Sequence, residues 1–162
     1  MKGMERETLH LWCAYPDDLM ADEAAQACAR LLSEDEDKRW CAFKFERHRR
    51  EFLATRALQR TALSACHSIA PQDWRFEVNA HGKPAAKPEC GLRFNLSNSL
   101  GLVVCLVSEG AEVGVDVEPY ERAEKIAEVA PRFFSPLELE QLERLGGAER
   151  LDRVLTDRKS VV

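Results

Sequence analysis

The sequence predicts an α+β fold with a mainly antiparallel sheet flanked by helices. Residues 46–69 contain no Gly or Pro and repeat apolar side chains at helical spacing, which predicts one long helix. Three consecutive segments between residues 92 and 118 are short and rich in Val and Leu, which is typical of neighbouring strands. With 162 residues and 45% hydrophobic content, the chain can bury a sizeable core.

The N-terminal part predicts a strand followed by two helices. Residues 9–15, LHLWCAY, are aromatic and aliphatic and predict a first strand that Pro16 ends. Apolar residues at helical spacing predict a helix over about 17–32. Ser33 and Glu36 then have the spacing of a capping box, which predicts the start of a second helix.

The long helix over 46–69 carries a basic stripe. Arg49, Arg56 and Arg60 stand at i, i+7 and i+11, so their guanidinium groups line one side of the helix. A solvated basic face is the simpler interpretation, and a local anion site is the alternative.

The second half of the chain predicts further strands and a helix. Ser135, Pro136 and Glu138 form a helix start signal, and Gly146-Gly147 a stop. The residues around Lys83 are rich in Pro and Gly and predict a loop. The predicted loop covers 79–91, and the predicted strands are 74–78, 92–97, 102–108 and 112–118. The strand over 102–108 is apolar throughout, which predicts a central position in the sheet.

Composition limits the classes of partner. The net charge of -5 gives no general attraction to nucleic acid or to an anionic membrane. No apolar run is long enough for a membrane span, and the start of the chain lacks the apolar centre of a signal peptide, so we expect a cytoplasmic protein. The six cysteines form no CxxC pair, and we expect them to be reduced, small core residues rather than zinc ligands or disulfides.

Two carboxylates, Asp116 and Glu118, stand two residues apart on the strand predicted over 112–118. Side chains two apart on a strand share one face at about 6 to 7 Å, so both can reach one hard cation. Few oxygen ligands with positions left for water suit Mg²⁺ held mainly by a phosphate-bearing substrate. A strand end whose acids only face solvent is the alternative interpretation.

Other polar residues favour a phosphate ligand. Lys83, in the turn HGKP, carries an ammonium group beside a glycine that lets backbone come close. Ser97 and Asn98 supply hydroxyl and amide donors at the end of a neighbouring strand. A cation site, a lysine turn and a row of donors together predict a polyphosphate.

The stretches GKP, FNLSNS, GVDVE and RFFSPLE, in this order, resemble the Sfp-type 4'-phosphopantetheinyl transferases across roughly residues 9–156. The resemblance implies a monomeric, Mg²⁺-dependent holo-[acyl-carrier-protein] synthase type of enzyme, which moves the phosphopantetheine arm of coenzyme A to a serine of an acyl or peptidyl carrier protein. It also implies two similar halves in one fold, here 1–90 and an incomplete 91–156.

The resemblance also assigns site residues. Asp116 and Glu118 correspond to the metal-binding acids. Asn98 stands where the family has His, which removes a charge from the phosphate site. The basic contacts are aligned loosely, so Arg39, Arg49 and Arg60 remain alternatives for the 3'-phosphate. The residues assigned to coenzyme A are Arg47, Arg56, Lys83, Ser97 and Asn98.

The end of the chain departs from the family pattern. The family's WxxKExxxK motif, which supplies the glutamate base, is expected near LDRVLTDRKSVV but is not found, so we expect the base to lie beyond the chain. Residues 157–162 match what a common sequencing-adapter sequence would encode, and we expect natural sequence to end near Thr156. An inactive fragment that binds coenzyme A or another nucleotide, and a Mg²⁺-dependent phosphohydrolase, are the alternative functions.

Overall fold

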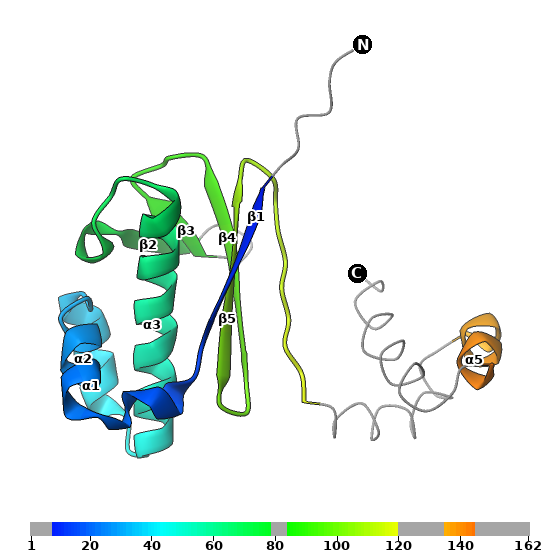
Figure 1. Cartoon of the computed structure of the whole chain (residues 1–162), viewed down its shortest axis with the longest axis horizontal. Helices are drawn as coiled ribbons and strands as arrows, with labels where there is room; N and C mark the ends of the chain where they lie inside the picture. The colour runs from blue at the N-terminus through cyan, green and yellow to red at the C-terminus, as the bar shows by residue number, and fades with distance from the viewer. Residues whose placement is uncertain (1–7, 79–83, 120–134, 145–162) are drawn as a thin grey trace, which may run out of the picture. The chain divides into compact units, whose positions relative to one another are not determined.

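The computed structural model describes residues 8–78, 84–119 and 135–144. The chain divides into two compact units, Met1–Val117 and Glu118–Val162. In the first unit, the described strands form a three-stranded sheet in the order β1-β5-β4 and a two-stranded sheet of β2 and β3 (Figure 1). All of these pairings are antiparallel, so the predicted α+β class with a mainly antiparallel sheet is confirmed.

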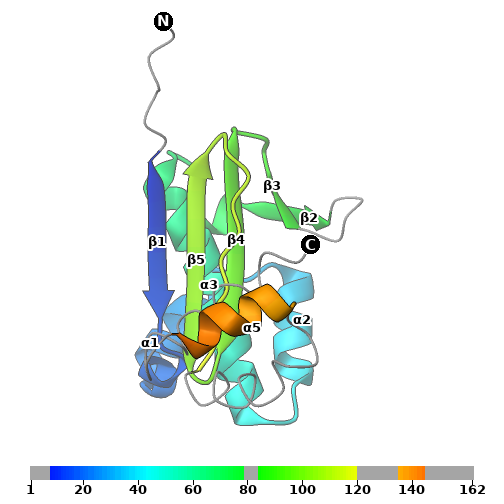
Figure 2. The same ribbon diagram turned by 90° about the vertical axis from the view of Figure 1, so that its right-hand side faces the viewer.

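The three-stranded sheet consists of predicted strands. Strand β5 (Leu102–Glu109) is central, as its apolar sequence predicts, between β1 (Leu9–Ala14) and β4 (Leu92–Ser99) (Figure 2). On β4 the side chains alternate, with Leu92 and Phe94 buried in the core. The other face of β4 therefore carries Arg93 and the polar residues that follow it at every second position.

Helix α3 (Glu46–Cys66) covers one face of this sheet, as Figure 1 shows. The prediction of one long helix is confirmed, and it ends where His67 adopts extended backbone angles. Leu58, Ala62 and Leu63 on α3 belong to the core cluster that also contains residues of β4 and β5. The core therefore lies between α3 and the sheet, and the opposite face of the sheet is left for other contacts.

The first predicted helix is divided. A 3-10 turn, η1 (Pro16–Met20), precedes α1 (Asp22–Ala29), and Ala21 between them is extended at φ -75° and ψ 126°. The prediction of one continuous helix over 17–32 is therefore wrong, because helical spacing alone does not reveal this break. The next helix, α2 (Glu34–Ala42), begins with the predicted capping box.

The region predicted as a loop over 79–91 contains a strand. Strand β3 (Pro84–Lys87) pairs with β2 (Arg75–Val78), which was predicted. The loop prediction is wrong for β3 because its one proline and two alanines are poor strand formers, and the pairing with β2 determines their conformation. The two-stranded sheet joins the core through Phe76, whose ring centroid lies 5.8 Å from that of Phe94.

Arg60 on α3 is buried, with only 1% of its surface exposed. Its guanidinium group lies 2.5 Å from Glu36 of α2 and donates hydrogen bonds to the carbonyl of Trp74 at 2.6 Å and that of Pro71 at 3.3 Å. The interpretation of the stripe as a solvated basic face is therefore wrong for Arg60. This ion pair ties together two helices and the start of β2.

The carboxylate of Glu36 is held in its charged form. Burial alone would raise its pKa, but a hydrogen bond from the Ser33 amide at 2.9 Å and the positive charge of Arg60 together lower it. A lowered pKa in the folded state means that Glu36 stabilises the fold at neutral pH. This contribution is lost as the pH falls through the lowered pKa.

We predict that Glu36→Gln destabilises the chain by about 3 kcal/mol at neutral pH, because it leaves Arg60 buried without its counter-charge. Urea unfolding followed by circular dichroism measures this, and the difference from wild type should shrink in strong acid. Asp35→Asn is the matched control, since this neighbouring side chain is 93% exposed and its removal should leave stability unchanged. Equal stability of Glu36→Gln and wild type would contradict the prediction.

The six cysteines differ in burial. Cys105 is buried in the core, which confirms the expectation for this residue, whereas Cys13 and Cys41 are exposed, so a core position is wrong for those two. All six are free thiols, as expected. Burial, with a smaller effect from nearby Cys66, raises the pKa of the Cys105 thiol to about 12.

Thiol reagents should therefore distinguish these cysteines. At pH 8 we expect a disulfide reagent to modify Cys13 and Cys41 first, and Cys105 only after unfolding, because the thiolate is the reactive form. Peptide mass spectrometry after timed labelling identifies the modified sites. Rapid labelling of Cys105 in the folded chain would refute this assignment of the core.

The described part of the second unit contains helix α5 (Pro136–Glu143). The amide of Leu139 donates to the carbonyl of Ser135, so the helix begins where its predicted start signal lies. The predicted stop at Gly146-Gly147 lies outside the described residues. Across the described ranges of both units, no helix has the length and apolar character needed to cross a membrane.

Candidate functional site

The polar face of β4 holds the segment that carries Asp116. Residues 112–117 run down the face of the sheet opposite α3 and lie over β4 (Figures 1 and 2). The side-chain oxygen of Asn95 accepts a hydrogen bond from the amide of Val115 at 2.9 Å. Two residues further along, the hydroxyl of Ser97 accepts one from the amide of Val117 at 3.1 Å. The segment is therefore attached to β4 by side chains.

Ser97 also fixes the carboxylate. Its hydroxyl donates a hydrogen bond to Oδ1 of Asp116 at 2.9 Å, while it accepts from the amide of Val117. Asp116 is exposed, so its carboxylate stays accessible to a ligand from solvent. A donor hydroxyl and a following backbone amide thus orient one exposed carboxylate on the sheet face.

The prediction of a strand over 112–118 is wrong. The segment is extended, but residues 112–119 form no strand, and the two hydrogen bonds described above are accepted by the side chains of Asn95 and Ser97 on β4. The backbone groups of a strand form hydrogen bonds in the plane of its sheet, so they cannot reach a segment that lies over the face. The alternation of Val and polar residues in the sequence therefore indicated an extended chain but not its partner.

The donor set around Asp116 suits a hard divalent cation. Asp116 belongs to the first compact unit and Glu118 begins the second, so their pairing remains a prediction from their spacing in the sequence. Carboxylate oxygens are the ligands that Mg²⁺ prefers, usually one or two from the protein, with water and phosphate supplying the rest. Within the described ranges, no cluster of three or more His, Cys, Asp or Glu could hold a metal ion. The Asp116 carboxylate would supply one protein ligand, which fits a Mg²⁺ ion held mainly by water and phosphate.

A second polar cluster lies on the α3 side of the sheet, in a groove of about 700 Å³. We call it the arginine groove. Arg56 lies 3.5 Å from Glu36, which also pairs with Arg60, so two positive charges share one carboxylate. Phe76 lines this groove together with charged residues of α2, α3 and β2, among which acids and arginines are equal in number: Glu34, Asp35, Glu36, Arg39, Arg56, Arg60, Arg75 and Glu77.

The arginines of the groove repel one another. Burial lowers the pKa of Arg56, the positive charges of Arg39 and Arg60 lower it further, and Glu36 opposes them. The guanidinium group nevertheless remains charged at neutral pH because the ordinary pKa of arginine lies far above neutrality. An anion that entered the groove would relieve the repulsion between these arginines.

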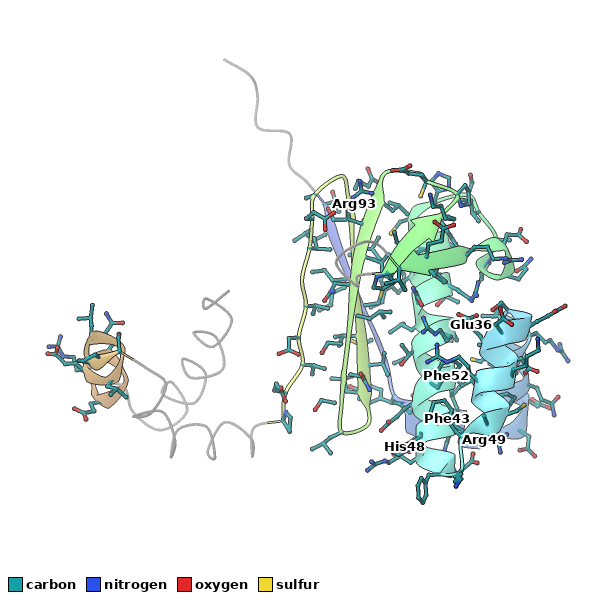
Figure 3. The ribbon with its side chains drawn as sticks, turned by 180° about the vertical axis from the view of Figure 1, so that it is seen from behind. Glu36, Phe43, His48, Arg49, Phe52 and Arg93 are labelled. Atoms are coloured by element: carbon teal, nitrogen blue, oxygen red, sulfur yellow. The ribbon has the colours of Figure 1, made fainter. Side chains whose placement is uncertain are left out.

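Aromatic rings position the arginines of the arginine groove. The guanidinium carbons of Arg39 and Arg56 lie 5.6 and 5.3 Å from the ring centroid of Phe52. Figure 3 shows Phe52 and Glu36 where α2 lies beside α3. Sequence reasoning assigned no function to Phe52, although its position four residues before Arg56 on one helix could have indicated this contact.

The structure separates several predicted site residues. Arg56 lines the arginine groove, whereas Arg47 lines a different hollow of about 200 Å³ beside Asp17 and Gly101. Ser97 and Asn98 are neighbours on β4 and therefore point to opposite faces of the sheet. Lys83 lies outside the described residues, but Pro84, which follows it, lines the arginine groove.

Asp116 and the arginine groove lie on opposite faces of the three-stranded sheet. Asp116 is bonded to the face that points away from α3, and the groove is lined by residues of α2 and α3. Among the described strands, β4 pairs with β5 and forms one edge of this sheet. Asn95, which sequence reasoning left without a function, belongs to the Asp116 side and could have been found from its position two residues before Ser97.

Comparisons with known proteins identify relatives. A sequence model of the family described as "4'-phosphopantetheinyl transferase, N-terminal" matches residues 20–111, more than half of the chain. The chain is 34% identical over 142 residues to 4'-phosphopantetheinyl transferase HetI of Nostoc sp., which covers 86% of this chain and 59% of that protein. It is 30% identical over 126 residues to 4'-phosphopantetheinyl transferase Sfp of Bacillus subtilis, which covers 70% and 54%.

A third protein is also similar to this chain. The phosphopantetheinyl transferase of Thraustochytrium sp. is 34% identical over 108 residues, or 65% of this chain and 37% of that protein. The chain thus spans about half the length of the curated relatives that it matches. The matched region contains α2, α3 and the strands that carry the arginine groove and the face bearing Ser97. By this match, the chain belongs to the 4'-phosphopantetheinyl transferase family.

Proposed function

We propose that the protein transfers the 4'-phosphopantetheine arm of coenzyme A to a serine of an apo carrier protein, with Mg²⁺ as the metal. Family membership supports the reaction type. The observation that carries the proposal is the Asp116 carboxylate, exposed and oriented by Ser97 at 2.9 Å. A carboxylate fixed in this way can hold a metal ion against a diphosphate.

The arginine groove is the proposed site for the 3'-phosphate of coenzyme A. Arg56 and Arg39 both line the groove, and Lys83 directly precedes the groove residue Pro84 in the sequence. Asn98, exposed near the end of β4, is the proposed amide donor to a phosphate oxygen of coenzyme A.

At the diphosphate, the proposed ligands are Asp116 and Glu118. Mg²⁺ bound to them would offset the negative charge that develops on the diphosphate as its bond breaks. The protein's own contribution is to hold Asp116 in place, so that the phosphorus atom stands open to attack by the carrier serine. The general base remains unassigned within this chain.

The proposed partners are coenzyme A and an acyl or peptidyl carrier protein, and the proposed state is a cytoplasmic monomer. A chain that binds coenzyme A without transferring its arm is the second candidate function. One observation favours it: position 98 is a neutral Asn, where the resembling family has a His that can carry positive charge.

Coenzyme A affinity tests the arginine groove. We predict that Arg39→Gln and Arg56→Gln each weaken coenzyme A binding about tenfold in calorimetry, because each removes a charged donor from the phosphate. Arg30→Gln, an exposed arginine outside the groove, is the control and should bind as wild type does. Wild-type affinity in both groove variants would exclude the groove as the phosphate site.

Arg47 is tested separately because it lines the other hollow. Loss of affinity in Arg47→Gln would extend the binding surface to that hollow.

Carrier modification tests the reaction itself. Incubation with coenzyme A, Mg²⁺ and an apo carrier protein should increase the carrier mass by one phosphopantetheine arm, measured by mass spectrometry. Asp116→Asn keeps the size of the side chain but loses the charge, and we predict a rate lower by about 100-fold. Binding of coenzyme A without any mass gain in wild type would support the second candidate, and full activity of Asp116→Asn would contradict the metal site.

A further inference from the structure

Asn95 and Ser97 form a ladder of side chains on the face of β4. Each accepts a hydrogen bond from a backbone amide exactly 20 residues further along the chain, Val115 and Val117. Because both partners advance together, the segment runs in the same direction as β4. The two-residue period of the strand therefore matches the two-residue period of the segment above it.

This ladder determines which way Asp116 points. The amides of Val115 and Val117 face β4, and Asp116 stands between them with its Oδ1 on the Ser97 hydroxyl. A slip of the segment by one residue would bring a different set of amides and side chains to β4. The positions of Asn95 and Ser97 thus determine the register of the segment that carries the acid.

The hydroxyl of Ser97 already forms two hydrogen bonds within the protein. It donates to a carboxylate and accepts from an amide within the protein, and a hydroxyl has one proton to donate. A bond from a hydroxyl to a carboxylate is charge-assisted and stronger than one between neutral groups. Donation to a phosphate oxygen of a ligand would require Ser97 to release Asp116.

We propose that Asn95 and Ser97 are positioning residues, which hold the segment 112–117 in register so that the Asp116 carboxylate meets a divalent cation, and that the Ser97 hydroxyl does not itself bind phosphate. This inference rests on the proposed metal site at Asp116. It assigns Asn95 to the site, and it changes the predicted function of Ser97 from ligand contact to orientation of a metal ligand.

The test combines two measurements on the full 162-residue chain. Hydrogen exchange followed by NMR reports whether the amides of Val115 and Val117 are protected. Electron paramagnetic resonance of Mn²⁺, without coenzyme A, reports the affinity for a divalent cation. The variants are Asn95→Ala, Ser97→Ala and Ser97→Thr, which keeps a hydroxyl. Ser99→Ala is the control, since Ser99 lies on the same face of β4.

We expect Ser97→Ala to weaken Mn²⁺ binding about tenfold and Asn95→Ala severalfold, since each removes at least one hydrogen bond that orders the segment. In Ser97→Ala the amide of Val117 should lose its protection from hydrogen exchange, and in Asn95→Ala the amide of Val115 should lose it. The amides of β5 should stay protected in both variants. Ser97→Thr should restore both readouts, and Ser99→Ala should match wild type. A purely structural effect would lower protection throughout the sheet instead.

The inference is overturned if Mn²⁺ affinity is unchanged in Asn95→Ala and Ser97→Ala, or if the wild-type chain binds no Mn²⁺. Should Ser97→Ala fail to fold, the comparison of Asn95→Ala with wild type decides. Coenzyme A binding and carrier modification are measured separately, so their absence together with the expected Mn²⁺ results would remove the proposed function and leave the inference standing.

Discussion

The alternation of side chains along β4 is the constraint on which the rest of the structure depends. One set, with Leu92 and Phe94, fills the core beneath α3. The other set, with Asn95 and Ser97, binds the segment that carries Asp116. One strand therefore joins the stability of the fold to the geometry of the acid, because neither set can change its spacing without moving the other.

On the α3 side, a single carboxylate serves both the fold and the arginine groove. Glu36 caps the start of α2, neutralises buried Arg60 and lies 3.5 Å from Arg56. Arg60 has a structural role, because its guanidinium group donates hydrogen bonds to two backbone carbonyls and to Glu36. Arg39 and Arg56, held against the Phe52 ring, are the proposed phosphate ligands. Within the basic stripe of α3, Arg60 thus has a structural role, whereas Arg56 is proposed to bind the ligand.

Local sequence patterns predicted most helices and strands, since the capping box at Ser33, the apolar run of β5 and the period of β4 each act within a few residues. The strand at Pro84–Lys87 depends on its pairing with β2, so local patterns missed it, and helical spacing did not reveal the break at Ala21. The sequence indicated Asp116 and Ser97 as polar site residues. It could not indicate that they bond to each other, because that contact depends on the segment crossing the sheet face.

A crystal structure of the chain with Mg²⁺ and coenzyme A tests the central claim most directly. The account predicts an Asp116 oxygen about 2.1 Å from the ion, with the diphosphate on the same ion and the Ser97 hydroxyl still bonded to Asp116. An ion bound away from Asp116, or a Ser97 hydroxyl turned to a phosphate oxygen with Asp116 released, would contradict it.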